Sequence, residues 1–141
     1  WLSKLYFLQE DFQNAELTLE KVVDINPYHV PSYRGLIAIL KDRGRTNDND
    51  LLIRYGNRVI EVEPDNNEMH DLVCGTYELM SSWSNAFAGY VRYSESISRQ
   101  LRRVTSSSFT NARAYNNLSI RSKAVAKKAA YARSMYLQTK R

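Results

Sequence analysis

Hydrophobic residues along most of this chain recur at intervals of three and four, the spacing of one face of an α-helix. The pattern predicts helices over 1–10, 12–25, 31–42, 48–62, 67–80 and 83–102. Glycine (5) and proline (3) are few in the 141 residues, which favours long helices over many short strands. The chain is long enough for one domain with a sizeable core. We therefore expect an all-α protein.

The last part of the chain has a seven-residue hydrophobic pattern. Residues 112–138 contain no Gly or Pro and are rich in good helix formers, so one helix about 40 Å long is expected. One face of it forms a seam of alternating three- and four-residue steps: Tyr115, Leu118, Ser122, Val125, Ala129, Ala132 and Tyr136. Two placements remain open. The first turns could cap the preceding helices while the end projects, or the whole helix could lie flat on the hairpin before it.

A short motif occurs twice and indicates an internal repeat. Phe12 to Ala15 and Trp83 to Ala86 both read aromatic-x-Asn-Ala, and they begin 71 residues apart. Pro27 and Pro64 follow two of the expected helices and lie 37 residues apart, three more than a repeat of about 34 residues. We place the three extra residues in the polar segment 41–50, which is too long for a tight turn between helices.

These residues resemble the tetratricopeptide repeat family over about residues 1–98. The matching positions are Leu2, Ser3, Tyr6, Phe12, Ala15, Leu19, Val22 and Pro27, then Tyr33, Leu36, Leu40, Leu52, Gly56, Val59 and Pro64, then His70, Val73, Cys74, Tyr77, Trp83, Ala86, Tyr90 and Tyr93. The resemblance implies a right-handed superhelical stack of helical hairpins, in which Ala15 and Ala86 allow close approach and Phe12 and Trp83 close the hairpin ends. It predicts three parts: repeats over 1–98, the first truncated and the second with a three-residue loop insertion; a linker over 99–111; and a basic capping or projecting helix over 112–141.

The resemblance also implies a protein-binding groove lined by the first helix of each repeat. Its lining residues here would be Lys4, Phe7, Arg34, Lys41, Glu68, Asp71 and Glu78, so the groove would be basic on the second repeat and acidic on the third. Family members that hold acidic chaperone tails use a clamp of Lys, Asn and Arg. Gly35, Glu68 and Leu72 stand at clamp positions in this chain, so an acidic chaperone tail is not the expected ligand.

Charge is divided unevenly along the chain. Residues 1–93 hold nine Lys/Arg and fourteen Asp/Glu, a net of −5, whereas residues 94–141 hold eleven Lys/Arg and only Glu95, a net of +10. The expected basic surface of the last helix comprises Arg113, Arg121, Lys123, Lys127 and Lys128. It could bind RNA phosphates or an acidic protein. Alternatively, the basic segment folds back on the acidic body. Attachment to a membrane surface is a weaker interpretation, since the apolar face is mostly Ala.

Catalytic patterns are not found. His70 stands where the repeat usually has a large aromatic residue and Cys74 takes a small-residue position, so both are interpreted as packing residues. The Cys and His spacing does not suit zinc, and no glycine-rich phosphate loop or nucleophile with its base is present. We expect no enzymatic activity, cofactor or metal. Arg102, Arg103 and Thr105 resemble a site for kinases that prefer basic residues, although such patterns are common in linkers.

The compartment is only weakly indicated. No run of 18 apolar residues occurs, so no membrane span is expected. The single cysteine excludes an internal disulfide and fits a reducing compartment, which favours an intracellular protein, soluble or part of a complex, in the cytoplasm or an organelle interior. The chain begins at Trp1, as a fragment or processed form would. The predicted function is a non-enzymatic scaffold for protein–protein interaction, a structural or assembly subunit of a larger complex. The alternative is an RNA-associated subunit that binds phosphates through the basic helix.

Overall fold

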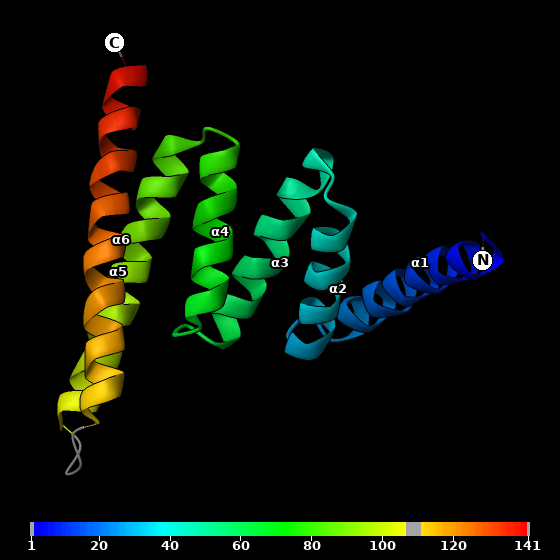
Figure 1. Ribbon diagram of the computed structural model, residues 1–141, viewed down its shortest axis with the longest axis horizontal. Coiled ribbons are helices and arrows are strands. Elements are labelled where there is room, and N and C mark those ends of the chain that lie inside the picture. Colours follow the sequence, from blue (N-terminus) through cyan, green and yellow to red (C-terminus); the bar gives the residue numbers. More distant parts are fainter. Residues whose placement is uncertain (1, 107–110, 141) are drawn as a thin grey trace. The chain divides into compact units, whose positions relative to one another are not determined.

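The computed structural model describes residues 2–106 and 111–140, with side chains from residue 11 onward. Most of these residues are helical, and no strand occurs among them (Figure 1). The helices are α1 (Leu2–Ile25), α2 (Val30–Arg43), the short 3₁₀ helix η1 (Thr46–Asp48), α3 (Asn49–Val62), α4 (Asn67–Leu79), α5 (Trp83–Ser106) and α6 (Ala112–Thr139). The all-α expectation is confirmed. The helices form two compact units, one over residues 1–62 and the other over 63–141.

In the first unit, α2 packs against both α1 and α3. Leu36 and Leu40 of α2 and Val59 of α3 are almost fully buried between these helices. Gly35 permits the close approach of α1, since a Cβ there would lie 2.9 Å from Leu19 Cδ1. Gly44 ends α2 in the left-handed conformation at φ 63°, where its N–H donates to the Leu40 carbonyl oxygen.

The second unit is a three-helix assembly in which α5 packs against α4 and α6. Its core residues are Cys74, Ala86, Tyr90, Tyr93, Ile97, Val125 and Ala132. The ring of Trp83, at the start of α5, meets Tyr131 near the end of α6 edge-on at 5.6 Å. The helix α6 therefore runs antiparallel along α5, and its last turns extend past the start of α5, as Figure 1 shows. Each of the two placements left open by the sequence thus describes part of α6.

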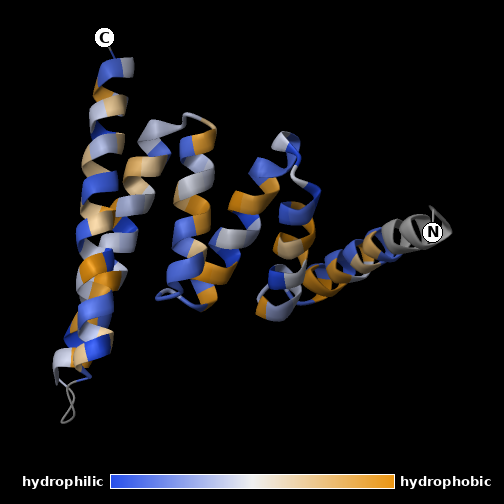
Figure 2. Ribbon diagram, in the orientation of Figure 1, coloured by the Kyte–Doolittle hydropathy of each residue, from blue (hydrophilic) through white to orange (hydrophobic). Residues whose placement is uncertain are grey.

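The seven-residue seam of α6 is the face that packs on α5. Val125 and Ala132 are buried, and Leu118, Ser122, Ala129 and Tyr136 are half-buried; only Tyr115 at the start is exposed. Figure 2 shows hydrophobic and hydrophilic residues on each helix, as expected when one side is covered and the other faces water. The seam prediction is confirmed from Leu118 onward.

The expected division of residues 1–25 into two helices is wrong. One helix, α1, runs without a break from Leu2 to Ile25. Phe12 is 50% exposed and Ala15 is exposed, so they do not close a hairpin end or mediate close helix approach. The physical reason is local: Gln9 to Gln13 contain no Gly or Pro, and the helix can simply continue.

The second copy of the motif does follow a break. The chain turns at Ser81, which has a φ of 54°, and Ser82 N–H donates to the Tyr77 carbonyl oxygen while Ser81 N–H donates to that of Glu78. These two bonds form a Schellman motif, which satisfies carbonyl groups at the end of α4. Trp83 then opens α5, and Ala86 is fully buried, as the repeat predicts. The same four-residue pattern thus has different structures because only one copy is preceded by a turn.

The helix predicted over 83–102 is longer in the structure than expected. Instead of stopping at residue 102, with a linker from residue 99, α5 continues to Ser106. No proline stands in this span to stop the helix, and Arg, Gln and Leu at 99–103 are good helix formers. After the link, Asn111 caps α6 by accepting a hydrogen bond from the Ala114 N–H at 3.1 Å.

Candidate functional site

One hydrogen bond recurs in the two hairpins α2–α3 and α4–α5. Tyr33 Oη donates to the Pro27 carbonyl oxygen at 2.8 Å, and His70 Nε2 lies 2.8 Å from the Pro64 carbonyl oxygen. Each bond spans six residues, and the two are 37 residues apart in both partners. Because a carbonyl can only accept, His70 carries its proton on Nε2. In each hairpin the bond connects the first helix to the loop before it. The two hairpins therefore share a side-chain contact as well as a sequence pattern.

His70 is a packing residue, as the sequence predicts. It is 1% exposed and its ring stacks on Tyr93 at 4.9 Å. Burial lowers the pKa of His70, and its Nδ1 atom has no hydrogen-bond partner. The side chain is therefore held neutral in the core of the second unit. Cys74 is likewise buried, and burial raises the pKa of its thiol to about 12.

The residues expected to line a groove lie on α2 in one unit and α4 in the other, and each face is described by itself. On α2, Arg34 and Lys41 are exposed. On α4, Glu68 and Asp71 are exposed and Glu78 is half-buried. The side chains of Lys4 and Phe7 lie outside the described residues. The two faces thus have opposite charge, basic on α2 and acidic on α4.

Two of the acidic groove candidates are held by bonds within the second unit. Arg121 of α6 donates to Asp71 Oδ2 at 2.8 Å and to the buried Tyr93 Oη at 2.5 Å. Tyr90 Oη donates to Glu78 Oε1 at 2.8 Å. Burial raises the pKa of Tyr93 to about 12, so its hydroxyl keeps its proton near neutral pH. Among the described side chains, Glu68 remains the exposed acid of this face that makes no such bond.

A hollow of about 490 Å³ lies between α4 and α6. Its α4 side is Asp71, and its α6 side is Asn117, Ile120, Arg121, Ala124, Val125 and Lys128. The α4 face continues past it to Gly75, where a Cβ would meet no atom within 4 Å. This side of α4 is therefore bordered by basic and apolar groups of α6 at Asp71 and has free space at Gly75.

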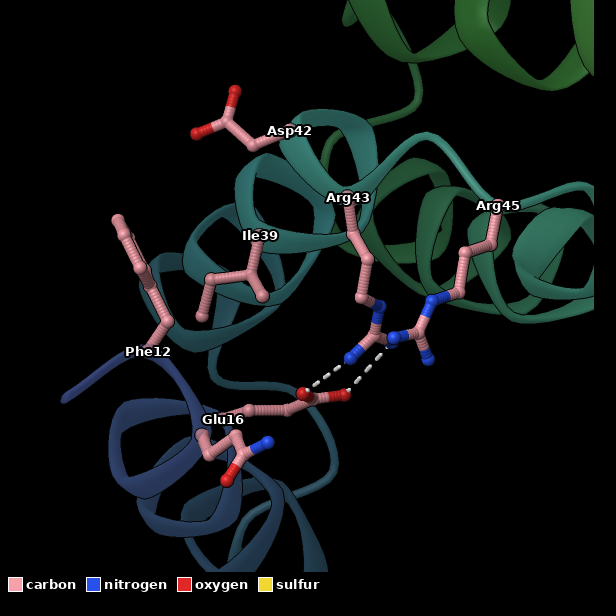
Figure 3. A pocket seen from close by; sticks show the side chains of 7 residues that line it. Phe12, Glu16, Ile39, Asp42, Arg43 and Arg45 are labelled. Carbon is pink, nitrogen blue, oxygen red and sulfur yellow. Dashed lines mark hydrogen bonds and ion pairs between the residues drawn. The ribbon is translucent and has the colours of Figure 1, made fainter. Parts of the chain in front are cut away.

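A second hollow of about 440 Å³ lies between α1 and α2 (Figure 3). Phe12 and Ile39 form its apolar part, and Asp42 and Arg45 lie on its rim. Arg43 closes the base by donating to both carboxylate oxygens of Glu16, at 2.8 and 3.2 Å, and to Asp48 at 3.0 Å. Sequence reasoning missed this site because it placed Phe12 at a buried hairpin end.

Asp65, in the loop before α4, binds two arginines of α5. It accepts hydrogen bonds from Ser96 Oγ at 2.9 Å, Arg99 Nη2 at 3.1 Å and Arg103 Nη1 at 2.7 Å. Burial alone would raise the pKa of Asp65, but the bonds from Ser96 and Arg99 and the charge of Arg103 outweigh burial and hold it below its usual range. Part of the basic segment therefore does fold back on acidic residues.

The remaining basic candidates on α6 differ in exposure, and Lys128 also borders the hollow beside Asp71. Arg113, Lys123, Lys127 and Lys128 are exposed, whereas Arg121 is half-buried between Asp71 and Tyr93. Arg121 thus belongs to the internal contacts of the unit, and the other four form what we call the cationic face of α6. The fold-back interpretation of the charge asymmetry therefore describes Arg99, Arg103 and Arg121, whereas a partner for the exposed cations stays a prediction.

Comparison with known proteins adds no family. No protein-family model matches the chain, and no curated protein sequence matches it. In the described residues, no three His, Cys, Asp or Glu side chains are grouped so that they could hold a metal ion. Over the same residues, none of the helices combines the length and apolar character needed to cross a membrane.

Proposed function

We propose that this chain is a tetratricopeptide-like helical repeat protein that serves as a scaffold for binding other proteins. The repeated hydrogen bonds of Tyr33 and His70 to proline carbonyls support a common hairpin design. Ala86 and Trp83 support it further, because they lie at the close-approach and hairpin-end positions of α5. In such repeats the first helix of each hairpin buries one face and leaves the other for a partner.

The open face of α4 is the observation that carries the proposal. Val73 and Cys74 on its inner side are buried, whereas Glu68 and Asp71 are exposed and Gly75 has free space beside it. A rigid helix that presents acidic groups around an uncovered glycine can accept an extended segment or a helix carrying basic residues. The proposed partner of this face is therefore a protein with Lys or Arg at the contact.

A photo-crosslinking experiment tests this surface. A photoreactive amino acid replaces Gly75, and in a control it replaces Val91, which is exposed on α5. We expect a discrete crosslinked protein from Gly75 and not from Val91 in cells that express the chain. Glu68→Lys should abolish that crosslink because it reverses the charge of the exposed acid that makes no bond to α5 or α6. Arg121→Gln, which removes the ion pair with Asp71 and keeps both exposed carboxylates of α4, controls for loosening of α6. Equal crosslinking at both positions, or a product insensitive to Glu68→Lys, contradicts the proposal.

RNA binding is a second candidate function, favoured by the cationic face of α6. Lys123, Lys127 and Lys128 are exposed on a helix segment without an acidic residue. On single-stranded RNA, each phosphate contact contributes about 0.7 to the slope of log affinity against log salt. Replacing these three lysines by Gln should therefore lower the slope by about 2 if all three meet phosphates.

The matched control neutralises three exposed cations elsewhere, with Lys21→Gln, Lys41→Gln and Arg45→Gln in the first unit. Binding of a homopolymeric single-stranded RNA is followed by fluorescence anisotropy at several salt concentrations. RNA recognition by α6 predicts a change for the α6 triple variant alone. An equal change in the control variant would mean that only net charge matters, and no change in either would exclude the α6 contact.

A further inference from the structure

The last turn of α5 carries a pattern of groups that neither proposed binding surface uses. Arg102 and Arg103 stand three and two residues before Thr105, and α5 ends one residue later at Ser106. Thr105 and Ser106 are exposed. A surface hydroxyl preceded by two guanidinium groups is the arrangement that serine/threonine kinases with acidic peptide grooves can bind, since carboxylates pair strongly with Arg.

The two arginines are accessible in the folded unit. Arg102 is exposed. Arg103 donates to Asp65, but its side chain is still 70% exposed, so one edge of the guanidinium remains open to a second carboxylate. Asp65 also accepts hydrogen bonds from Ser96 and Arg99, so it keeps partners when Arg103 turns to a carboxylate of a kinase.

The backbone around Thr105 can open readily. Thr105 Oγ1 donates to the carbonyl oxygens of Leu101 and Arg102, at 3.0 and 3.1 Å, and Ser106 Oγ donates to that of Arg103 at 3.2 Å. Such side-chain bonds compete with the helical backbone pattern. Thr105 lies in the last described turn of α5, and the last turns of helices open at low free energy. Thr105 can thus reach the extended form that a kinase active site needs.

We propose that Thr105 is a phosphorylation site for a serine/threonine kinase that recognises Arg102 and Arg103. In the reaction, Thr105 Oγ1 bonds to the γ-phosphorus of Mg·ATP, and the bond from that phosphorus to the β–γ bridging oxygen breaks. ADP leaves, and the hydroxyl proton passes to the catalytic base of the kinase.

The modification would loosen the end of α5. The phosphorylated oxygen has no proton to donate, so the bonds to the Leu101 and Arg102 carbonyl oxygens are lost. A charge of about −1.5 to −2 would lie beside the carbonyl groups at the negative end of the helix, where it is unfavourable. Leu101 packs against the core of the second unit, so fraying there weakens the support of α6. Phosphorylation at this position is therefore expected to lower the thermal stability of the second unit.

The experiment uses the folded full chain, a purified basic-directed serine/threonine kinase and Mg·ATP, with the site located by tandem mass spectrometry. One phosphoryl group at Thr105 is expected. Thr105→Val should remove it and Thr105→Ser should retain it, which separates loss of the acceptor from misfolding. Arg102→Gln should slow the reaction at least tenfold, if one charge-assisted bond of about 1.5 kcal/mol or more is lost.

Thr139 provides a control inside the same molecule. It is exposed at the end of α6 and its hydroxyl donates to the Tyr136 carbonyl oxygen at 2.7 Å, but Tyr136 and Leu137 stand where Thr105 has arginines. It should stay unmodified. Equal labelling of Thr139, an unchanged rate for Arg102→Gln, or labelling only of heat-unfolded chain would overturn the proposal. An unchanged melting temperature of the phosphorylated chain would overturn the predicted loosening of α5.

Discussion

Two glycines of the second unit allow a sharp test of how closely α4 and α5 approach. A Cβ added at Gly75 of α4 would meet no atom within 4 Å, whereas a Cβ at Gly89 of α5 would lie 3.0 Å from Cys74 Sγ. The same change to Ala should therefore act differently at the two sites. At Gly75 only the helix propensity changes, and Ala should raise the free energy of unfolding by about 0.8–1.0 kcal/mol.

At Gly89 the same gain in propensity is opposed by a steric clash. Overpacking a well-packed core costs about 1–3 kcal/mol, so Gly89→Ala should leave stability unchanged or lower it by up to about 2 kcal/mol. Cys74→Ala removes the opposing sulfur atom. In that background Gly89→Ala should be stabilising by about 1 kcal/mol, and a double-mutant cycle should show a coupling of about 1–3 kcal/mol.

Urea denaturation followed by tryptophan fluorescence measures these differences. Trp1→Phe leaves Trp83 as the sole tryptophan, and Trp83 reports on the second unit because it packs on Tyr131. Unfolding curves are compared at constant m-value, since a changed slope would indicate a different unfolding reaction. If Gly89→Ala stabilised the chain as much as Gly75→Ala while Cys74 is present, the close packing of α4 on α5 described above would be wrong.

Three further changes test the fold. Ser81→Gly should raise stability by up to about 1 kcal/mol, because Ser81 has a φ of 54° that Gly adopts without strain, and a loss of stability would contradict the turn. Ala86→Leu should lower the urea midpoint through overpacking of about 1–3 kcal/mol, and an unchanged midpoint would refute the repeat register. His70 has a lowered pKa, so the unfolded chain binds more protons as pH falls through about 6.5, and the free energy of unfolding should fall below that pH by at most about 1.4 kcal/mol per pH unit. His70→Phe should show a shallower dependence in urea titrations from about pH 7.5 to 5.5, and an equal slope would assign the effect to other groups.

Helical periodicity was enough to predict most elements of this chain. The seam from Leu118 to Tyr136 lies on one side of α6 because residues three and four apart share a helix face, whatever the helix packs against. The turn before Trp83 was likewise expected from the repeat. The continuous helix α1 was not, because the motif at Phe12 has the same letters as the one at Trp83 but lacks a local turn before it.

The polar contacts were decided only by tertiary structure. The sequence predicted an exposed Arg121 on the basic surface, yet this side chain lies between Asp71, fifty residues away, and the buried Tyr93. Asp65 meets Arg99 and Arg103 across more than thirty residues, and Arg43 meets Glu16 across 27. Hydrophobic faces repeat with the helix because burial requires a continuous stripe. Charged side chains obey no such period, and whether one is paired or open to a partner depends on which helices pack together.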